Sequence, residues 1–331
     1  VGDESGYLDG VGTNIQFTYP SDVKMTSNGE YVYVADYSRN SIRKITIPTL
    51  TSTTLTNIDG TDDVDGIGTN AFINRPISFS ISPSDSYLLI SQPDSQVIRK
   101  LVLNTLEVSG FVGCFDEDEK YVDDVGTNAR FSNVYGISIS PDELYALVAD
   151  YGNNLIRKII ISTRVVSTLV GNKDGGSIDG YGTNAQFLQP SSVSISSDGL
   201  FVLITDSGNH LIRKVIISTT EVTRIAGQES VSGSNNGIGT NALFNGPISI
   251  TISSDNSFAV ISDSTNNIIR QIILSTGYVR TIGGGSSNVA DYSDGFGTNS
   301  YFNNPVGVCL SSDNSFVLVA DSGNFRVRKI S

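Results

Sequence analysis

The sequence predicts an all-β fold, a six-bladed β-propeller whose blades are four-stranded antiparallel sheets. The first observation behind this is a Gly-Thr-Asn loop that recurs at nearly constant spacing. Its glycines are Gly12, Gly68, Gly126, Gly182, Gly239 and Gly297. The second is that short β-branched or apolar runs follow each loop and are separated by turn residues, a pattern typical of consecutive antiparallel strands. Six such units match a radial propeller better than a sandwich, because a closed ring leaves few sheet edges exposed.

Residues 179–217 show the repeated unit most clearly. They begin with the loop DGYGTN, whose glycines permit the positive φ of a tight turn. Three strand-like runs and the turns SDG and DSGN follow, and a fourth run ends at Ala226-Gly227. Within this unit we expect strands at residues 191–196, 200–205, 211–217 and 221–225.

The whole chain is expected to form a single propeller domain, residues 1–331. Blade six ends after its third strand, so within this chain it lacks its outer strand. Val1-Gly2 aligns with the end of an outer strand, as in Val170-Gly171. Val1 is not a start residue, and we expect either preceding residues of a longer chain or a neighbouring molecule to complete blade six. The expected blades are residues 9–57, 65–113, 123–171, 179–227, 236–284 and 294–331.

The chain is acidic, with 21 Lys and Arg against 34 Asp and Glu and a net charge of −13. Much of its positive charge lies in an Arg-Lys pair repeated in the third strand of the units. The remaining surface is therefore a poor partner for nucleic acid or anionic membranes, and it favours cations or basic protein surfaces. The sequence also contains no apolar run long enough to cross a bilayer and no recognisable signal peptide, so membrane insertion is not expected.

Two cysteines are present, Cys114 and Cys309. They fall in units that should face each other across the ring, so a disulfide between them is not expected. No Asn-X-Ser/Thr acceptor occurs, which argues against N-linked glycans and leaves O-linked sugars open.

The repeated motifs resemble the NHL-repeat family of β-propellers. The resemblance rests on the loop DGxGTNAxF, a following proline, the turns SPDG and SSDN, and the strand motifs VLVAD and SGNxxIRKI, and it covers all six units. It implies an interaction platform, although some relatives are enzymes. Enzymatic relatives such as peptide-amidating lyases hold zinc with several histidines, and this chain has only His210. No motif aligns with the calcium-dependent lactonase-type propellers, and no cofactor is predicted.

An aspartate precedes an arginine by seven residues in five of the six units. We interpret these pairs as structural, fixing the register of each hairpin. The alternative is a ring of charges around one mouth of the central channel. In unit two Gln92-Pro93 replaces the aspartate, which leaves Arg99 without that partner, and we favour sequence drift over a specialised position. The pairs are Asp36 and Arg43, Asp150 and Arg157, Asp206 and Arg213, Asp263 and Arg270, and Asp321 and Arg328.

Acidic loops invite a metal interpretation. Asp9, Asp65, Asp124, Asp179 and Asp294 are assigned to one loop position, with Asn236 there in unit five, and we interpret them as caps of a glycine turn. A calcium loop would need a regular ligand spacing and a terminal Glu, which are missing here. No metal site is therefore predicted, and the nearest calcium candidates are Asp59, Asp62, Asp63 and Asp65.

Candidate ligand contacts lie at the channel mouth. Tyr37 and Tyr151 follow the repeated aspartate in turns, where they could meet a ligand or serve as turn residues. Gln92 and Arg99 mark the irregular unit, and His210 is the one imidazole, in a turn. Phenylalanines at a fixed place in the units should wedge between blades as core. These are Phe17, Phe131, Phe187, Phe244 and Phe302, with Ile73 in unit two.

No nucleophile–base pair and no phosphate loop stands out, so we expect the protein not to be an enzyme. The hypothesis that the sequence favours is an extracellular structural or interaction scaffold, on a cell surface or in a fibre. Such a scaffold would contact protein partners or copies of itself. The alternative is a soluble module that binds a peptide or glycan at the channel mouth. A third hypothesis is a metal-dependent hydrolase or lyase.

Overall fold

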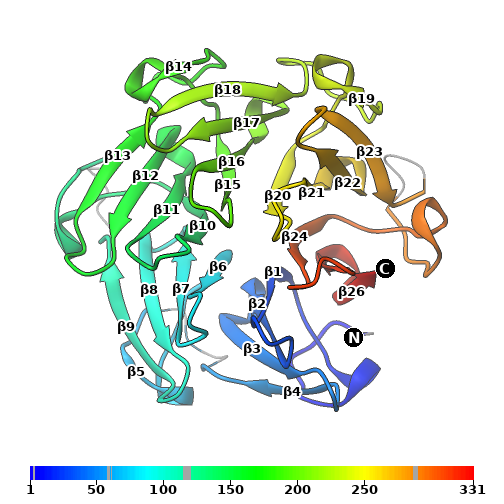
Figure 1. The fold of residues 1–331 in the computed structure, drawn as a ribbon. Helices are drawn as coiled ribbons and strands as arrows, with labels where there is room; N and C mark the ends of the chain where they lie inside the picture. Colours follow the sequence, from blue (N-terminus) through cyan, green and yellow to red (C-terminus); the bar gives the residue numbers. More distant parts are fainter. Residues whose placement is uncertain (3, 58–59, 61, 115–120, 286–289) are drawn as a thin grey trace.

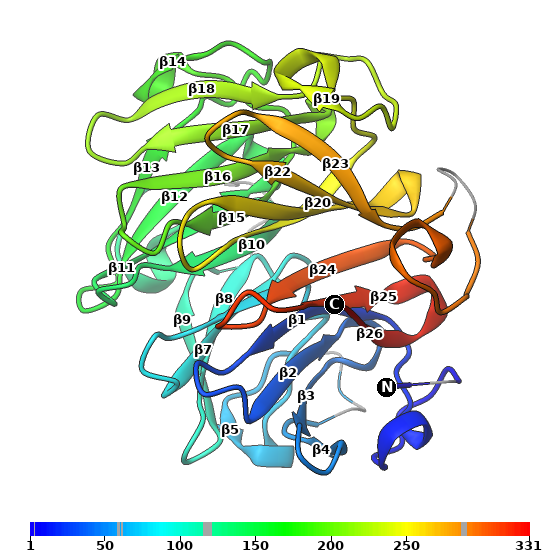
Figure 2. The same ribbon diagram turned by 45° about the vertical axis from the view of Figure 1, so that its right-hand side comes forward.

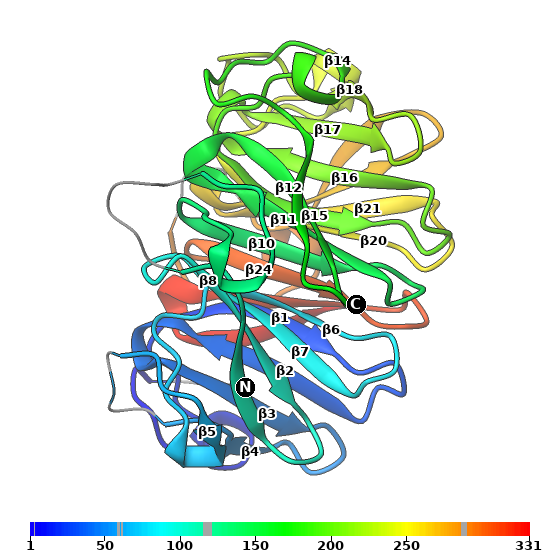
Figure 3. The same ribbon diagram turned by 90° about the vertical axis from the view of Figure 1, so that its left-hand side faces the viewer.

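Six antiparallel sheets surround a central axis and form the six-bladed propeller that the sequence predicts (Figure 1). The computed structural model describes residues 1–2, 4–57, 60, 62–114, 121–285 and 290–331. Within these residues every helical segment is a three-residue 3₁₀ turn. Seen from the side, the strands of the ring run roughly along its central axis (Figure 3).

Each blade runs outward from an inner strand nearest the axis (Figure 1). Blade one contains β1 (Pro20–Met25), β2 (Tyr31–Asp36), β3 (Ser41–Thr46) and β4 (Thr51–Thr54). Blade two contains β6 (Ser78–Ile81), β7 (Tyr87–Gln92), β8 (Val97–Val102) and β9 (Glu107–Val112). Blade three contains β10 (Val134–Ile139), β11 (Tyr145–Asp150), β12 (Leu155–Ile160) and β13 (Val166–Val170).

The second half of the ring repeats this order. Blade four contains β15 (Pro190–Ile195), β16 (Phe201–Asp206), β17 (Leu211–Ile216) and β18 (Glu221–Ala226), within one residue of the expected strands. Blade five contains β20 (Pro247–Ile252), β21 (Phe258–Asp263), β22 (Ile268–Ile273) and β23 (Tyr278–Gly283). Blade six contains three strands, β24 (Pro305–Leu310), β25 (Val317–Asp321) and β26 (Arg326–Ile330).

Short strands cover the outer strand of several blades from its far side. They are β5 (Gly66–Ile67) on β9, β14 (Gly180–Tyr181) on β18 and β19 (Gly237–Ile238) on β23. In blades one and three, single bridges from Val11 to Thr51 and from Val125 to Val165 do the same. The outer strands of blades one to five are therefore held between two backbone partners.

The 3₁₀ turns fall at two repeated places. One set forms the Gly-Thr-Asn loops, at η1 (Gly12–Asn14), η3 (Gly68–Asn70), η4 (Gly126–Asn128), η6 (Gly182–Asn184), η8 (Gly239–Asn241) and η10 (Gly297–Asn299). The other set joins the second and third strands, at η2 (Tyr37–Arg39), η5 (Tyr151–Asn153), η7 (Ser207–Asn209), η9 (Ser264–Asn266) and η11 (Ser322–Asn324).

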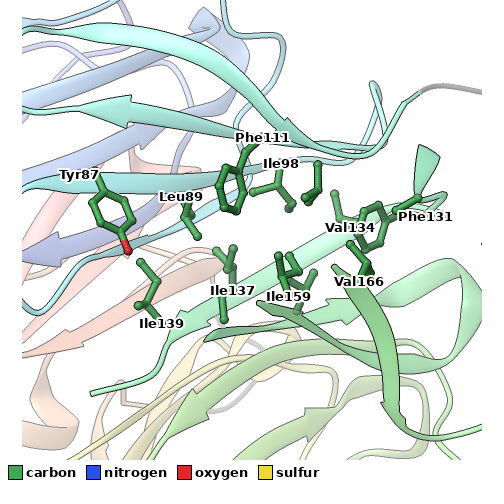
Figure 4. Close-up of a cluster of buried hydrophobic side chains, with 14 residues drawn as sticks. Tyr87, Leu89, Ile98, Phe111, Phe131, Val134, Ile137, Ile139, Ile159 and Val166 are labelled. Atoms are coloured by element: carbon green, nitrogen blue, oxygen red, sulfur yellow. The ribbon is translucent and has the colours of Figure 1, made fainter. Parts of the chain in front are cut away.

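The hydrophobic core lies between neighbouring blades. The phenylalanines that the sequence assigned to the core, and Ile73 in their place in blade two, are at most 1% exposed. Figure 4 shows one such layer, where Tyr87 and Leu89 of blade two face Ile137 and Ile159 of blade three. Full burial of a large apolar side chain stabilises a fold by about 1.5–3 kcal/mol, so these layers hold the blades together.

Blade six joins the two ends of the chain. The Val327 N–H donates to the Val1 carbonyl at 3.0 Å, and the Val1 amino group donates to the Val327 carbonyl at 2.8 Å. Val1 therefore pairs with β26 as Val170 pairs with Ile156 in blade three, which is the alignment expected from the sequence. Figure 2 shows blade six between blades five and one.

A buried arginine occupies the same place in the third strand of every blade. In five blades it meets the aspartate at the end of the second strand, and four of these ion pairs lie within hydrogen-bond distance. Burial raises the pKa of Asp150, Asp206 and Asp263 to about 6, so their carboxylates are ionised at neutral pH beside their arginines. The distances are 3.9 Å for Asp36–Arg43, 2.8 Å for Asp150–Arg157, 2.9 Å for Asp206–Arg213, 3.0 Å for Asp263–Arg270 and 3.0 Å for Asp321–Arg328.

The other end of each guanidinium binds a residue in the loop that opens the blade. The contacts are Asp9 at 2.6 Å, Asp65 at 2.5 Å, Asp123 at 2.5 Å, Asp179 at 2.6 Å, Asn236 at 3.2 Å and Asp294 at 2.8 Å. The assignment of Asp124 to this position is wrong, because Asp123 stands three residues before Gly126, the spacing found in the other blades. The Asp124 carboxylate instead accepts the N–H of Val125 at 2.7 Å.

Arg213→Ala is expected to lower the free energy of unfolding by about 3–5 kcal/mol, because it leaves Asp206 buried without its cation. The matched control is Arg224→Ala. Arg224 lies opposite Arg213 on β18 with an exposed side chain, so its loss should change stability by about 0.5 kcal/mol or less. Urea unfolding of both variants measures the difference. Equal losses would contradict the role assigned to the buried pair.

Candidate functional site

The central axis of the ring is almost closed. The cavity between the inner strands measures about 20 Å³, and its lining includes Ser21, Asp22 and Ser192. A Cβ atom on Gly136 would lie 2.6 Å from the Cα of Ser192, because the inner strands of blades three and four approach so closely. A ligand therefore cannot enter the axis without displacing backbone, and the available surface is the channel mouth.

Asp22 brings a carboxylate to this axis, and its oxygens are already used. The Ser78 hydroxyl donates to it at 2.8 Å and the Phe79 N–H at 3.1 Å, which links blade one to blade two. Lys24 forms an ion pair with it at 2.5 Å. We therefore assign Asp22 to the joint between two inner strands.

Two tyrosine pairs gather at the mouth. Tyr37 contacts Tyr19 edge-to-face with ring centroids 5.8 Å apart, and Tyr151 stacks on Tyr135 at 4.5 Å. All four side chains are half-buried. Burial raises the pKa of Tyr135 to about 12, and the hydroxyls of Tyr151, Tyr37 and Tyr19 raise it further. We call these four residues the tyrosine rim.

The sequence pointed to only half of this rim. Tyr37 and Tyr151 begin the turns after β2 and β11. Their position beside a repeated aspartate made them candidate ligand contacts. Tyr19 directly precedes β1, and Tyr135 is the second residue of β10. The sequence does contain a signal for these two residues. An aromatic residue stands at the start of the inner strand in the same two units that carry Tyr37 and Tyr151.

Blade two supplies an ion pair to the same area. Arg75 and Asp94 lie 2.7 Å apart, and the Arg75 guanidinium is 5.8 Å from the centre of the Tyr37 ring. The Arg75 side chain is 54% exposed, so it remains accessible to a partner. The rim and this pair together span blades one to three.

The opposite half of the mouth is different in character. Buried serines occupy the positions that are equivalent to Tyr37 and Tyr151. These serines are Ser207, Ser264 and Ser322. The Ser264 hydroxyl donates to the Asn304 amide oxygen at 2.6 Å, which uses it within the fold. The mouth therefore has an aromatic half and a serine half.

His210 lies at a joint between blades. It has a left-handed φ of 60°, and its Nδ1 accepts the N–H of Gly246 at 3.1 Å. Asn40, Asn154 and Asn267 accept equivalent N–H groups at 2.7–2.9 Å at the same place in other blades. Burial lowers the pKa of His210, which agrees with an unprotonated Nδ1. The imidazole thus replaces an asparagine amide as a link between blades four and five.

Gln92 and Arg99 lie inside blade two, at 0% and 2% exposure, and not on the mouth surface where the sequence analysis placed them. The side chains at these two strand positions point into the layer between blades. Gln92 Nε2 donates to Asp63 at 2.5 Å, and Arg99 binds Asp63 at 3.2 Å and Asp65 at 2.5 Å. Asp63 therefore supplies the carboxylate that Gln92 lacks.

The same contacts bear on the calcium candidates. Asp63 and Asp65 face the Arg99 guanidinium, which disfavours a cation between them. Asp62 is exposed, and Asp59 lies outside the described residues. Within the part of the chain that the structure describes, no group of three His, Cys, Asp or Glu residues could hold a metal ion.

The two cysteines lie as the sequence suggests. Cys309 is buried in β24, and Cys114 is exposed after β9 in the loop toward blade three. No disulfide joins these two residues. Burial raises the pKa of the Cys309 thiol, so it is protonated and unreactive at neutral pH.

Known proteins with similar sequences contain NHL repeats. The NHL repeat family model matches residues 302–330, from the core Phe302 to the end of β26. The bovine (Bos taurus) NHL repeat-containing protein 2 is 25% identical across 99% of this chain. The chain is thus a β-propeller similar to NHL repeat-containing proteins, with an NHL repeat matched in its sixth blade. It spans 41% of the length of the bovine protein.

Other proteins similar to this chain carry different names. The chloroplast protein SUPPRESSOR OF QUENCHING 1 of Arabidopsis thaliana is 25% identical over 83% of this chain and is covered over 27% of its own length. An auxiliary nutrient binding protein from Bacteroides thetaiotaomicron matches 98% of this chain and 72% of its own, with a TM-score of 0.74 and 15% identity. Virginiamycin B lyase from Staphylococcus aureus matches 98% of this chain and 84% of its own, with a TM-score of 0.58 and 15% identity. At these identities the two structures share only the propeller fold with this chain.

In residues 1–331, outside the short undescribed gaps, no helix is long and apolar enough to span a bilayer.

Asp63→Ala is expected to lower the free energy of unfolding by about 1.5–3 kcal/mol, because Arg99 loses one of its two carboxylates. Adding Gln92→Asp to that variant should recover most of the loss, since it restores the aspartate found in the other blades. A double-mutant cycle in urea measures this coupling. Asp62→Ala, at an exposed neighbour, is the control, and a double variant no more stable than Asp63→Ala would contradict the assignment.

His210→Asn should leave the melting temperature nearly unchanged, because asparagine accepts the same N–H in three other blades and tolerates positive φ. His210→Ala should lower the free energy of unfolding by about 1–2 kcal/mol, through the lost hydrogen bond and the left-handed backbone. Calorimetry of both variants tests the structural role. If asparagine costs as much as alanine, the imidazole does something else.

Proposed function

We propose that this protein is a non-enzymatic interaction scaffold that binds a protein partner at its tyrosine rim. The NHL propeller fold is compatible with a protein-binding scaffold. The observation that carries the proposal is the gathering of four tyrosines and the Arg75–Asp94 pair on one half of a closed channel mouth.

Tyrosine and arginine are the residues that most often dominate binding energy at protein interfaces. The rim is also ordered before binding. Tyr135 and Tyr151 are already stacked, and Asn304 donates to the Tyr19 hydroxyl at 2.8 Å. A partner therefore meets side chains that lose little conformational freedom on contact. The net charge of −13 favours a neutral or basic partner segment.

The chemistry of the rim favours binding over catalysis. Burial raises the pKa of Tyr19, Tyr37, Tyr135 and Tyr151, so their hydroxyls stay protonated at neutral pH. Such hydroxyls donate and accept hydrogen bonds but make weak general bases. Because the same fold occurs in virginiamycin B lyase and in nutrient-binding proteins, fold alone does not decide between these roles.

A finer proposal concerns where the scaffold works. We place it outside the cell, on a surface or in a fibre, and the acidic composition supports this. Light scattering of residues 1–331 across a concentration series tests the fibre, since self-association would support it and a strict monomer would not.

Replacing Tyr37 and Tyr151 by serine converts the aromatic half of the mouth into the serine half found on blades four to six. We expect peptides that the wild-type protein selects from a random phage-displayed library to bind the double variant at least tenfold more weakly. The loss should follow from missing aromatic contacts with the fold intact.

The control is Tyr181→Ser, which removes a 57% exposed tyrosine at β14, on the outer edge of blade four. It should retain peptide binding. Equal binding by all three proteins would place the interface elsewhere. A glycan array read in parallel separates the alternative, because rim-dependent binding to glycans but not to peptides would identify a carbohydrate-binding module.

A further inference from the structure

The tyrosine rim is rich in hydrogen-bond donors. Burial raises the pKa of all four tyrosines, so each hydroxyl keeps its proton at neutral pH. A guanidinium carries five N–H donors, and the Arg75 guanidinium binds Asp94 through one nitrogen, Nη1, at 2.7 Å. The Arg75 side chain is 54% exposed, so further donors are accessible to a ligand.

The acceptors at the same place are already used within the fold. The amide oxygens of Asn40 and Asn304 accept a backbone N–H and a serine hydroxyl, at 2.9 and 2.6 Å. The aspartates before the two rim turns, Asp36 and Asp150, are fully buried and accept backbone N–H groups. The Asp94 carboxylate is bound to the rim arginine. The rim therefore suits a ligand that accepts hydrogen bonds more than it donates them.

The rim is also a shallow surface. The axial cavity of about 20 Å³, on whose lining Tyr135 lies, is too small for a ligand side chain. The strands β1 and β10 are innermost in their blades, so their free edges face this closed axis (Figure 1). A ligand therefore lies across the tyrosine rings. It neither inserts a long side chain into the axis nor adds a strand to these sheets.

A proline-rich segment combines the properties that this surface requires. Each proline has a carbonyl acceptor and no N–H donor. A polyproline II helix has no internal hydrogen bonds, so its carbonyls are free to accept from tyrosine and arginine. Its rigid rings pack on aromatic surfaces. Building on the proposed function of the rim, we infer that it binds a proline-rich segment of a partner protein in the polyproline II conformation.

The placement of the rings fits such a helix. Blade one holds the edge-to-face pair of Tyr37 and Tyr19. Blade three holds the stacked pair of Tyr151 and Tyr135. In blade two the position of Tyr37 is taken by Pro93, which is buried. A polyproline II helix is extended, at about 3.1 Å per residue, so eight residues span about 25 Å and carry prolines along one straight face to both pairs.

The same donors and acceptors disfavour a glycan at this mouth. Each glycan hydroxyl donates as well as accepts, so a glycan needs free acceptors in its binding site. The described acceptors of Asn40, Asn304 and Asp94 already have protein donors. A tract of prolines brings no backbone N–H that would lose its partner on binding.

The test uses residues 1–331 and a fluorophore-labelled octaproline peptide, with binding followed by fluorescence anisotropy. We expect saturable binding. The control peptide has four Gly-Ser repeats and the same label, and it should bind at least tenfold more weakly. Both peptides carry no charged side chain, so the net charge of −13 does not distinguish them.

Three protein variants locate the site. Tyr37→Ser, Tyr151→Ser should weaken octaproline binding at least tenfold, because two rings are lost. Tyr151→Phe keeps the stacked ring and removes one donor, so it should weaken binding about fivefold. The control Tyr181→Ser, on the outer edge of blade four, should bind as the wild-type protein does.

The outcomes separate this inference from the proposed function. If rim-dependent peptides emerge from the random library but octaproline does not bind at millimolar concentration, the partner segment is of another kind and only the inference is overturned. If neither the library peptides nor octaproline depends on the rim, both fail.

Two results with the variants would also overturn the inference. Equal octaproline binding by the wild-type protein and the double serine variant would place the peptide elsewhere. Unchanged binding by Tyr151→Phe would remove the role of this hydroxyl as a donor to the proline carbonyls.

Discussion

The buried arginine of the third strand is the contact on which each blade depends. It joins the end of the second strand, the loop that opens the blade and a core phenylalanine ring, as Arg213 does with Asp206, Asp179 and Phe187. A guanidinium can satisfy several acceptors in one plane, which a lysine cannot. The Asp206 carboxylate also accepts the backbone N–H of Leu188, which lies just before the inner strand. Through this carboxylate, the arginine fixes the loops at the channel mouth.

We call the buried arginine and its carboxylate partners the clamp. It explains why the blades differ from one another mainly at the mouth and perimeter. With strand ends and loops held by the clamp, the residue after the second strand can change from serine to tyrosine without altering the backbone. Tyr151 and Ser207 begin the same kind of 3₁₀ turn. Blade two shows the tolerance of the clamp itself, since Asp63 reaches Arg99 from a different loop position when Gln92 replaces the usual aspartate.

Sequence reasoning reached the fold and part of the candidate site. It reached Tyr37 and Tyr151 because they stand at a repeated position, and the five Asp–Arg pairs because their spacing is constant. It missed Tyr19 and Tyr135, because each meets its partner tyrosine only through the pairing of the inner strand with the second strand of its own blade. It misplaced Gln92 and Arg99 on the surface, because burial between blades is a property of two neighbouring sheets. His210 looked chemically distinctive, yet its neighbour Gly246 makes it a joint.

The sequence by itself determined the repeat, the order of strands within each unit and the gap in blade six, because these follow from local periodicity and turn chemistry. The tertiary structure decided which side chains meet across blades. Tyr37 and Arg75 belong to different blades, and only the closed ring brings the Arg75 guanidinium to 5.8 Å from the centre of the Tyr37 ring. Contacts between distant segments arise from packing geometry, which no local pattern encodes.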